Sequence, residues 1–102
     1  MHVGAFDTLR SMSHFFYLAR CSDGSLYAGT CLDLLARQEK HNDGTGAKYT
    51  RSRRPIVFVY HEKFQTLSEA RKREAAVKKL PKAKKELLVR APKKVPKRAK
   101  KP

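Results

Sequence analysis

The stretch FFYLARCSDGSLYAG, residues 15–29, carries two tyrosines on either side of an Asp-Gly pair. Asp-Gly between two apolar runs is a strong signal for antiparallel strands joined by a tight turn, so we expect a hairpin with strands near 14–21 and 25–29. Tyr17 and Tyr27 then lie close in space. On local evidence alone, β-propensity explains both residues, because an aromatic side chain fits a pleated, half-buried surface whether or not it does chemistry.

The residues after the hairpin predict a helix, a third strand and two further helices. Asp33 serves as N-cap for a helix over 34–42, and GAKYTRSRRP, residues 46–55, is a positively charged loop. Residues 56–64, IVFVYHEKF, are apolar on both faces, as in an interior strand. Thr66 and Glu69 have capping-box spacing for a helix to about residue 80, and Pro81 suits the first turn of a short third helix. The order β-β-α-β-α-α predicts an α+β domain with a small three-stranded antiparallel sheet flanked by helices.

The length of 102 residues allows one domain with one core. Residues 1–13 show no sustained periodicity and are expected to be an extension outside the core, whereas residues 14–90 are expected to form the domain. Residues 91–102, APKKVPKRAKKP, combine three prolines with six basic residues and no acid. This composition cannot bury a core, so a disordered basic tail is expected.

The charge balance predicts a polyanionic partner. Lys and Arg number 24 against nine acids, a net charge of +15, which favours nucleic acid. An anionic membrane surface competes, but no apolar run approaches the roughly 20 residues that a spanning helix needs, and no secretory signal is evident. We therefore expect a cytoplasmic protein without membrane association. Cys21 and Cys31 have no metal-like spacing and are expected to be reduced packing thiols.

A carboxylate interrupts the apolar stripe of the second expected helix. At 100° per residue, Leu67, Ala70, Val77 and Leu80 define its buried face, and Glu74 falls inside that face. A carboxylate facing a core needs a positive partner, either a metal ion or a fixed cation. The sequence leaves both open, together with a margin position from which the carboxylate reaches solvent.

The first expected helix has a similar interruption. Arg37 and His41 are spaced i, i+4 and share a face with Leu34, its most natural core anchor. Each alone is commonly structural. Combined with Glu74 and two phenols they provide what phosphodiester hydrolysis needs, which is an activated water, positive charge around the phosphorus and a metal that helps the leaving oxygen depart.

These residues, in this order, resemble the GIY-YIG nuclease superfamily, in particular its small stand-alone bacterial (UPF0213-like) subfamily. FFY at 15–17 stands where the family has GIY, and YAG at 27–29 where it has YIG. Arg37 and His41 match the helix arginine and a common histidine, the segment 46–55 matches the basic segment, and SEARKREAAVKKL at 68–80 matches the helix with the metal-binding glutamate. The resemblance covers about residues 15–90. The chain departs from the pattern at Phe15, Phe16 and Ala28, and it lacks the asparagine that many members carry beyond the glutamate.

The resemblance implies a GIY-YIG domain acting as a metal-dependent endonuclease on DNA, with DNA expected ahead of RNA. Glu74 would hold one Mg²⁺ or Mn²⁺ ion, its other ligands being water and phosphate oxygens. Tyr17 and Tyr27 would position the attacking water, Arg37 would stabilise the transition state, and His41 would orient a tyrosine or pass a proton. The residues that would bind backbone phosphates or the nucleic acid are Lys48, Tyr49, Arg51, Arg53 and Arg54.

A non-catalytic nucleic-acid-binding protein with the same fold is the alternative, and an RNA-binding accessory of the ribosome ranks last. The sequence does not determine the oligomeric state.

If Tyr17 and Tyr27 share one site, the register of the hairpin must place both side chains on the same face of the sheet. A two-residue turn would pair Arg20 with Tyr27 and send Tyr17 to the opposite face. We therefore predict a three-residue loop that pairs Ala19 with Tyr27, with Gly24 at positive φ forming a bulge.

Overall fold

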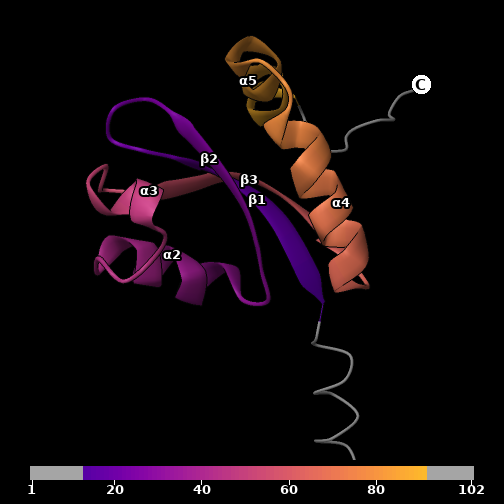
Figure 1. Cartoon of the computed structure of the whole chain (residues 1–102), viewed down its shortest axis with the longest axis horizontal. Coiled ribbons are helices and arrows are strands. Elements are labelled where there is room, and N and C mark those ends of the chain that lie inside the picture. Colours follow the sequence, from indigo (N-terminus) through magenta and orange to yellow (C-terminus); the bar gives the residue numbers. More distant parts are fainter. Residues whose placement is uncertain (1–12, 92–102) are drawn as a thin grey trace, which may run out of the picture.

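The computed structural model describes residues 13–91, and their elements follow the expected order. The expected extension and tail lie outside these residues, except for their inner ends. Figure 1 shows the strands between two groups of helices. The strands are β1 (His14–Arg20), β2 (Leu26–Cys31) and β3 (Val57–Phe64); the helices are α2 (Leu34–Asn42), α3 (Lys48–Arg51), α4 (Leu67–Lys78) and α5 (Lys82–Arg90).

The sheet is antiparallel with strand order β2-β1-β3. The expectation that residues 56–64 form the interior strand is therefore wrong, because β1 is central and β3 is an edge. Val57 is 53% exposed, whereas Phe16, Tyr17, Leu18 and Ala19 of β1 are buried. The physical reason is that helices cover both faces of the sheet, so an edge strand can also be apolar on both faces.

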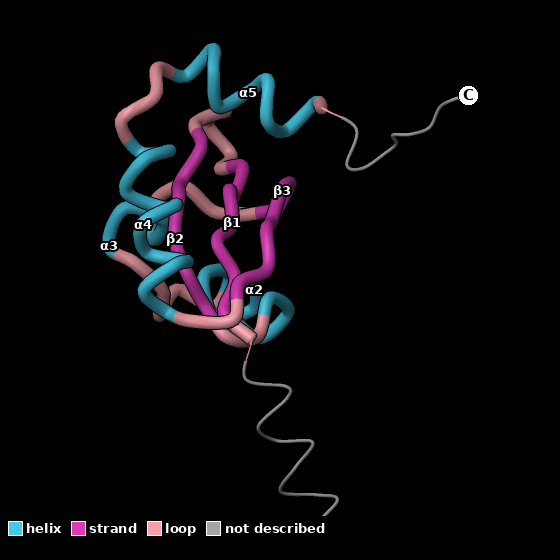
Figure 2. Tube along the Cα trace, turned by 90° about the vertical axis from the view of Figure 1, so that its right-hand side faces the viewer, coloured by secondary structure: helices cyan, strands magenta, loops and turns pink. Residues whose placement is uncertain are grey.

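Alternate residues of β1 supply two separate cores. Tyr17 and Ala19 pack with Ile56 and both cysteines on the face covered by α2 and α3. Phe16 and Leu18 pack with Val77 on the face covered by α4 and α5. Figure 2 views the backbone from the side on which these two helices lie. Cys21 and Cys31 are free and buried, as expected.

The hairpin has the predicted three-residue loop. Ala19 pairs with Tyr27 in the β1–β2 ladder, and the Cys21 N–H donates to the Ser25 carbonyl at 2.9 Å. Gly24 has φ +87°, and a Cβ added there would have no heavy atom within 4 Å, so glycine is used there for its backbone conformation. Tyr17 and Tyr27 consequently share one face of the sheet.

The register irregularity of the sheet lies between β1 and β3. Leu18 pairs with Tyr60, whereas Ala19 pairs with Phe58, so one extra residue of β3 stands between these pairs. Without it, alternation would put Phe58 and Tyr60 on the same face. The shift directs Phe58 to the α2 face, where its ring stacks on Tyr17 with centroids 4.1 Å apart.

Local signals account for most helix ends. Asp33 caps α2 by accepting from the Ala36 N–H at 3.0 Å, and Thr66 and Glu69 form the predicted capping box of α4. Two expectations need correction. Residues 46–55 are not all loop, because they contain the one-turn helix α3, and Leu67, expected in the buried stripe, is 39% exposed at the first position of α4.

Ion pairs attach α5 and α4 to the sheet. Arg20 at the end of β1 forms a bidentate salt bridge with Glu86 of α5. Arg73 of α4 forms another with Glu62 of β3. Arg20, by hydrogen bonding, lowers the pKa of Glu86 to about 2.

Among the described residues, no helix has the length and apolar character needed to cross a bilayer.

Candidate active site

A buried hydrogen bond between Tyr17 and His41 lies at the centre of the α2 face. The Tyr17 hydroxyl is 2.9 Å from His41 Nε2, and each residue is only 1% exposed. On the other side of the ring, His41 Nδ1 is 2.8 Å from the hydroxyl of Thr50, a fully buried residue of α3. Hydrogen bonds thus connect the three polar side chains in series, from the sheet to α3.

Two glycines leave space for this hydrogen-bonded series of side chains. A Cβ at Gly29 would lie 2.5 Å from the Tyr17 hydroxyl oxygen, and a Cβ at Gly46 would lie 2.5 Å from His41 Nδ1. Neither position requires a positive φ, so close packing explains these glycines. Gly29 is the glycine of the YAG stretch, which gives that glycine a direct steric role beside Tyr17.

Aromatic rings connect this centre with the surface. Tyr27 contacts His41 with ring centroids 5.5 Å apart and is only partly buried. Tyr49, at 39% exposed, stacks on Tyr27 at 5.8 Å, and the guanidinium of Arg53 lies 3.9 Å above the Tyr49 ring. Tyr27 is therefore the phenol nearer to solvent, whereas Tyr17 is enclosed.

Burial determines the protonation of the centre. Burial, followed by the neighbouring Tyr27 phenol, raises the pKa of Tyr17, and the charge and hydrogen bonding of Arg37 oppose this only in part. Burial also lowers the pKa of His41, and the nearby charge of Arg37 lowers it further. At neutral pH the pair is consequently a neutral phenol and a neutral imidazole.

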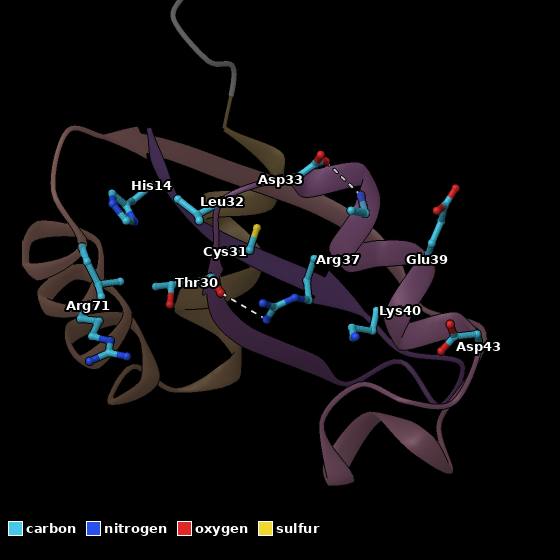
Figure 3. Close-up of a pocket in the computed structure, with 12 residues that line it drawn as sticks. His14, Thr30, Cys31, Leu32, Asp33, Arg37, Glu39, Lys40, Asp43 and Arg71 are labelled. Carbon is cyan, nitrogen blue, oxygen red and sulfur yellow. Dashed lines mark hydrogen bonds between the residues drawn. The ribbon is translucent and has the colours of Figure 1, made fainter. Parts of the chain in front are cut away.

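Arg37 lies between the buried centre and an open groove. Its guanidinium donates to the Thr30 carbonyl at 3.4 Å, and it lines a groove of about 630 Å³ along the outer edge of β2. Figure 3 shows Arg37 on α2 and Arg71 on α4 at opposite sides of this groove, with Thr30 between them. The groove therefore joins the α2 and α4 sides of the sheet.

The groove carries both signs of charge. Its basic lining residues are Lys40, Arg37 and Arg71, with His14 at one end, and its acidic ones are Asp33, Glu39 and Asp43. Asp33 and Asp43 are engaged with backbone N–H groups, of Ala36 and Thr45 respectively. Arg37 and Arg71 form no ion pair within residues 13–91, so a phosphate that entered the groove would meet two uncompensated guanidinium groups.

The basic segment is divided between structural and exposed cations. Arg53 donates to Asp23 at 3.0 Å and thereby ties the hairpin loop to this segment. Arg54 donates to the carbonyls of Arg51 and Asn42. Lys48 and Arg51, the first and last residues of α3, are exposed and form no ion pair with an acidic side chain within residues 13–91.

Glu74 lies away from the tyrosines. It belongs to α4, which packs Ala70 and Val77 on the opposite face of the sheet, and its side chain is 20% exposed. Its carboxylate pairs with Lys78 at 3.0 Å. The sequence left a metal ion, a cationic partner and a margin position open. Within the described residues Glu74 has a cationic partner, a lysine one turn along the same helix, and its partial exposure also fits the margin position.

Around Glu74 the protein offers a metal ion few ligands. No group of three or more His, Cys, Asp or Glu side chains is assembled within residues 13–91. Mg²⁺ is commonly held by one or two carboxylates, with water and phosphate as its other ligands. Glu74 keeps some exposure, and its partner Lys78 is 54% exposed and can rotate away, so the single carboxylate fits an ion of this kind.

Sequence reasoning missed several residues that build the site. Thr50 and Gly46 enclose His41, and Arg71 lines the groove, yet no local pattern distinguishes any of them. Asn42 exchanges two hydrogen bonds with the backbone of Ile56, at 2.7 and 2.8 Å. It therefore holds the start of β3 against α2 and does not replace the asparagine that many GIY-YIG nucleases carry.

Comparison with known proteins agrees with this architecture. Residues 13–86 match the GIY-YIG catalytic domain. A UPF0213 protein of Staphylococcus aureus (strain Mu3) is 54% identical over 78 residues, which cover 76% of this chain and 95% of that protein.

Two solution NMR structures are also similar. The UPF0213 protein BH0048 from Bacillus halodurans matches with a TM-score of 0.50 and 45% identity over 76% of this chain and 83% of that one. The protein EF2693 from E. faecalis matches with a TM-score of 0.51 and 50% identity over 72% and 79%.

The fold and these matches define a GIY-YIG catalytic domain, and the chain belongs to that family. Within the family its relatives are UPF0213 proteins. These names state no activity, so the function has to be argued from the site.

Proposed function

We propose that this protein is a metal-dependent, endonuclease-like enzyme that hydrolyses phosphodiester bonds in DNA. The observation that supports the proposal most directly is the buried Tyr17–His41 hydrogen bond, with Tyr27 beside it and Arg37 connecting it to the groove. A fold needs no such polar chain in its core, since polar groups are costly to bury unless every one of them is paired.

The two tyrosines differ in exposure, and we infer different tasks for them from this difference. Tyr27, nearer to solvent, would hold the attacking water. Tyr17 would act from the buried side of the site, through its hydrogen bond to His41. Arg37 would stabilise negative charge on the phosphorus, because it is the cation shared by the groove and the buried pair.

Glu74 would hold the metal ion, one Mg²⁺ or Mn²⁺. When bound, the ion would polarise the phosphate and assist departure of the leaving oxygen. Glu74 follows Arg71 by one helical turn on α4, and Arg71 lines the groove. This spacing supports Glu74 on the α4 side of the same groove, once Lys78 has turned away.

The exposed cations would hold the nucleic acid backbone. Lys48 and Arg51 of α3 and Arg71 in the groove would contact phosphates, and Tyr49 would offer a ring for stacking. Such contacts bring affinity without sequence preference, so binding should weaken steeply with salt.

A cleavage assay tests the proposal. The full-length protein is incubated with supercoiled, branched and single-stranded DNA and with matched RNA, in Mg²⁺, Mn²⁺ or EDTA. We expect cleavage of DNA that EDTA abolishes, and a loss of about 10²–10³-fold on Arg37→Ala, the range typical of removing one transition-state contact.

Tyrosine variants provide a matched control for the same assay. Tyr27→Phe removes a hydroxyl at the site and should lower the rate, whereas Tyr60→Phe removes one on the opposite face, where it contacts Glu62, and should not. Equal effects of the two changes would contradict the assignment.

Two observations favour the alternative of a catalytically weak or inactive binding protein. Glu74 is already paired with Lys78, and Tyr17 is almost fully enclosed. Salt-sensitive DNA binding without cleavage under any metal condition would support this alternative. The basic segment would then be the functional surface.

A further inference from the structure

Thr50 is a buried polar residue without a role in the proposed chemistry. It lies on α3, is 0% exposed, and its hydroxyl oxygen is 2.8 Å from His41 Nδ1. The same oxygen is 2.9 Å from the Ala47 carbonyl, to which it donates. A threonine hydroxyl has one proton, so a hydroxyl that donates to Ala47 can only accept from the imidazole.

This proton count determines the state of His41. If Thr50 accepts, His41 Nδ1 carries the proton, and Nε2 of the neutral ring carries the lone pair. The Tyr17 hydroxyl, 2.9 Å from Nε2, must then be the donor in that bond. A single hydrogen bond on α3 thus sets the direction of the bond at the catalytic tyrosine.

No other group in the described part of the chain competes with Thr50 for the hydrogen bond at His41 Nδ1. A Cβ at Gly46 would lie 2.5 Å from Nδ1, so the backbone closes over this side of the ring. The groups that face His41 from the packed elements are Tyr17 from β1, Tyr27 from β2, Arg37 from α2, Thr50 from α3 and Phe58 from β3. Of these, Thr50 alone lies within hydrogen-bond distance of Nδ1 in the described part of the chain.

We propose that Thr50 is a positioning residue that holds His41 as the Nδ1–H tautomer, so that its Nε2 lone pair is aimed at the Tyr17 hydroxyl. The catalytic consequence rests on the proposed nuclease function. When the proton moves, the Tyr17 O–H bond breaks and an Nε2–H bond forms. The products are a phenolate near Arg37 and an imidazolium whose Nδ1–H remains on Thr50.

The tautomer can be measured without any nuclease assay. Imidazole ¹⁵N chemical shifts of the full-length protein distinguish a protonated Nδ1 from a protonated Nε2. We expect Nδ1–H in the parent and in Thr50→Ser, which keeps the hydroxyl. In Thr50→Val, which keeps the shape but not the acceptor, we expect loss of the single Nδ1–H state. An Nε2–H signal in the parent, or an unchanged tautomer in Thr50→Val, would overturn the proposal.

Activity then separates this proposal from the proposed function. If the parent cleaves DNA, Thr50→Val should lose about 10–100-fold, by analogy with the hydrogen-bond partners that orient metal-ligating histidines, and Thr50→Ser should restore most of it. Wild-type cleavage by Thr50→Val despite a changed tautomer would refute the catalytic consequence. The expected tautomers without cleavage in the parent would support the Thr50 assignment and refute the nuclease. Should Thr50→Val fail to fold, the spectra of the parent and Thr50→Ser still test the tautomer.

Discussion

The two faces of the sheet differ in chemistry although the same strand supplies both. On the α4 face, β1 contributes Phe16 and Leu18 to an apolar core. On the α2 face it contributes Tyr17, which enters a buried chain of hydrogen bonds with His41 and Thr50. An apolar core tolerates conservative repacking, whereas a polar chain is stable only when every group is paired. We therefore expect substitutions on the first face to change stability and those on the second to change activity.

The largest effect on stability is expected at Leu18. It is fully buried on the α4 face, and Leu18→Ala should lower the free energy of unfolding by about 2–5 kcal/mol, the range for a leucine truncated in a core. Urea titration measures this change. Because the side chain points away from Tyr17, cleavage per folded molecule should be retained, and its loss would show that the two faces are coupled.

Gly29→Ala should affect the opposite face. The new Cβ would lie 2.5 Å from the Tyr17 hydroxyl oxygen, and overpacking of this kind typically costs about 1–3 kcal/mol. Tyr17 must shift from His41, so cleavage should fall much more than the folded fraction measured by thermal melting.

Gly24→Ala is the matched control for Gly29→Ala. Gly24 has φ +87° and open space where a Cβ would lie, so alanine there is strained by about 1–2 kcal/mol through the backbone alone. Cleavage by the folded protein should persist. Equal loss of activity in both variants would mean that destabilisation, and not the contact with Tyr17, explains the effect.

Acidification should weaken the two faces in different pH ranges. The pKa of His41 is lowered by burial, so between the ordinary value of 6.5 and the folded value the unfolded chain binds a proton that the native protein does not. Stability is therefore lost as the pH falls below about 6.5. The pKa of Glu86 is lowered from 4.5 to about 2, mainly by Arg20, so its contribution is lost only between those values.

Unfolding free energies from pH 8 to pH 3 test this order. His41→Gln should remove the loss near pH 6, and Glu86→Gln should reduce the loss below pH 4.5. A parent protein whose stability is constant between pH 7 and pH 5 would contradict the buried, neutral state of His41.

The smallest effect on stability is expected at Glu74. Its ion pair joins residues four apart on one helix to a largely exposed lysine, and such pairs contribute less than about 1 kcal/mol. Glu74→Gln should therefore melt close to the parent but lose cleavage, and a rise in melting temperature with Mg²⁺ should occur in the parent alone.

Lys78→Gln is the control for Glu74→Gln. It breaks the same ion pair but keeps the carboxylate, so its stability should change as little and its activity should remain. A parent that ignores Mg²⁺, with both variants equally active, would leave Glu74 as a structural residue and favour the binding protein.

The order of elements and the hairpin could be predicted because their signals are local. Asp-Gly marked the turn, Thr66 and Glu69 marked the start of α4, and the requirement that Tyr17 and Tyr27 share a face selected the three-residue loop with Gly24 at positive φ. Tyr17, Tyr27 and His41 are also brought together as predicted, and their catalytic roles stay a prediction.

Tertiary structure decided the rest. The edge position of β3 and the extra residue that directs Phe58 beneath Tyr17 depend on pairing between strands about 40 residues apart in the chain. Thr50 reaches His41 only because α3 packs against α2, and the carboxylate of Glu74 takes Lys78 as its partner. Periodicity along a helix or strand states which face a residue occupies, because that geometry is local. It cannot state which residue of another element meets that face, because chain folding and packing across the sheet set this partner.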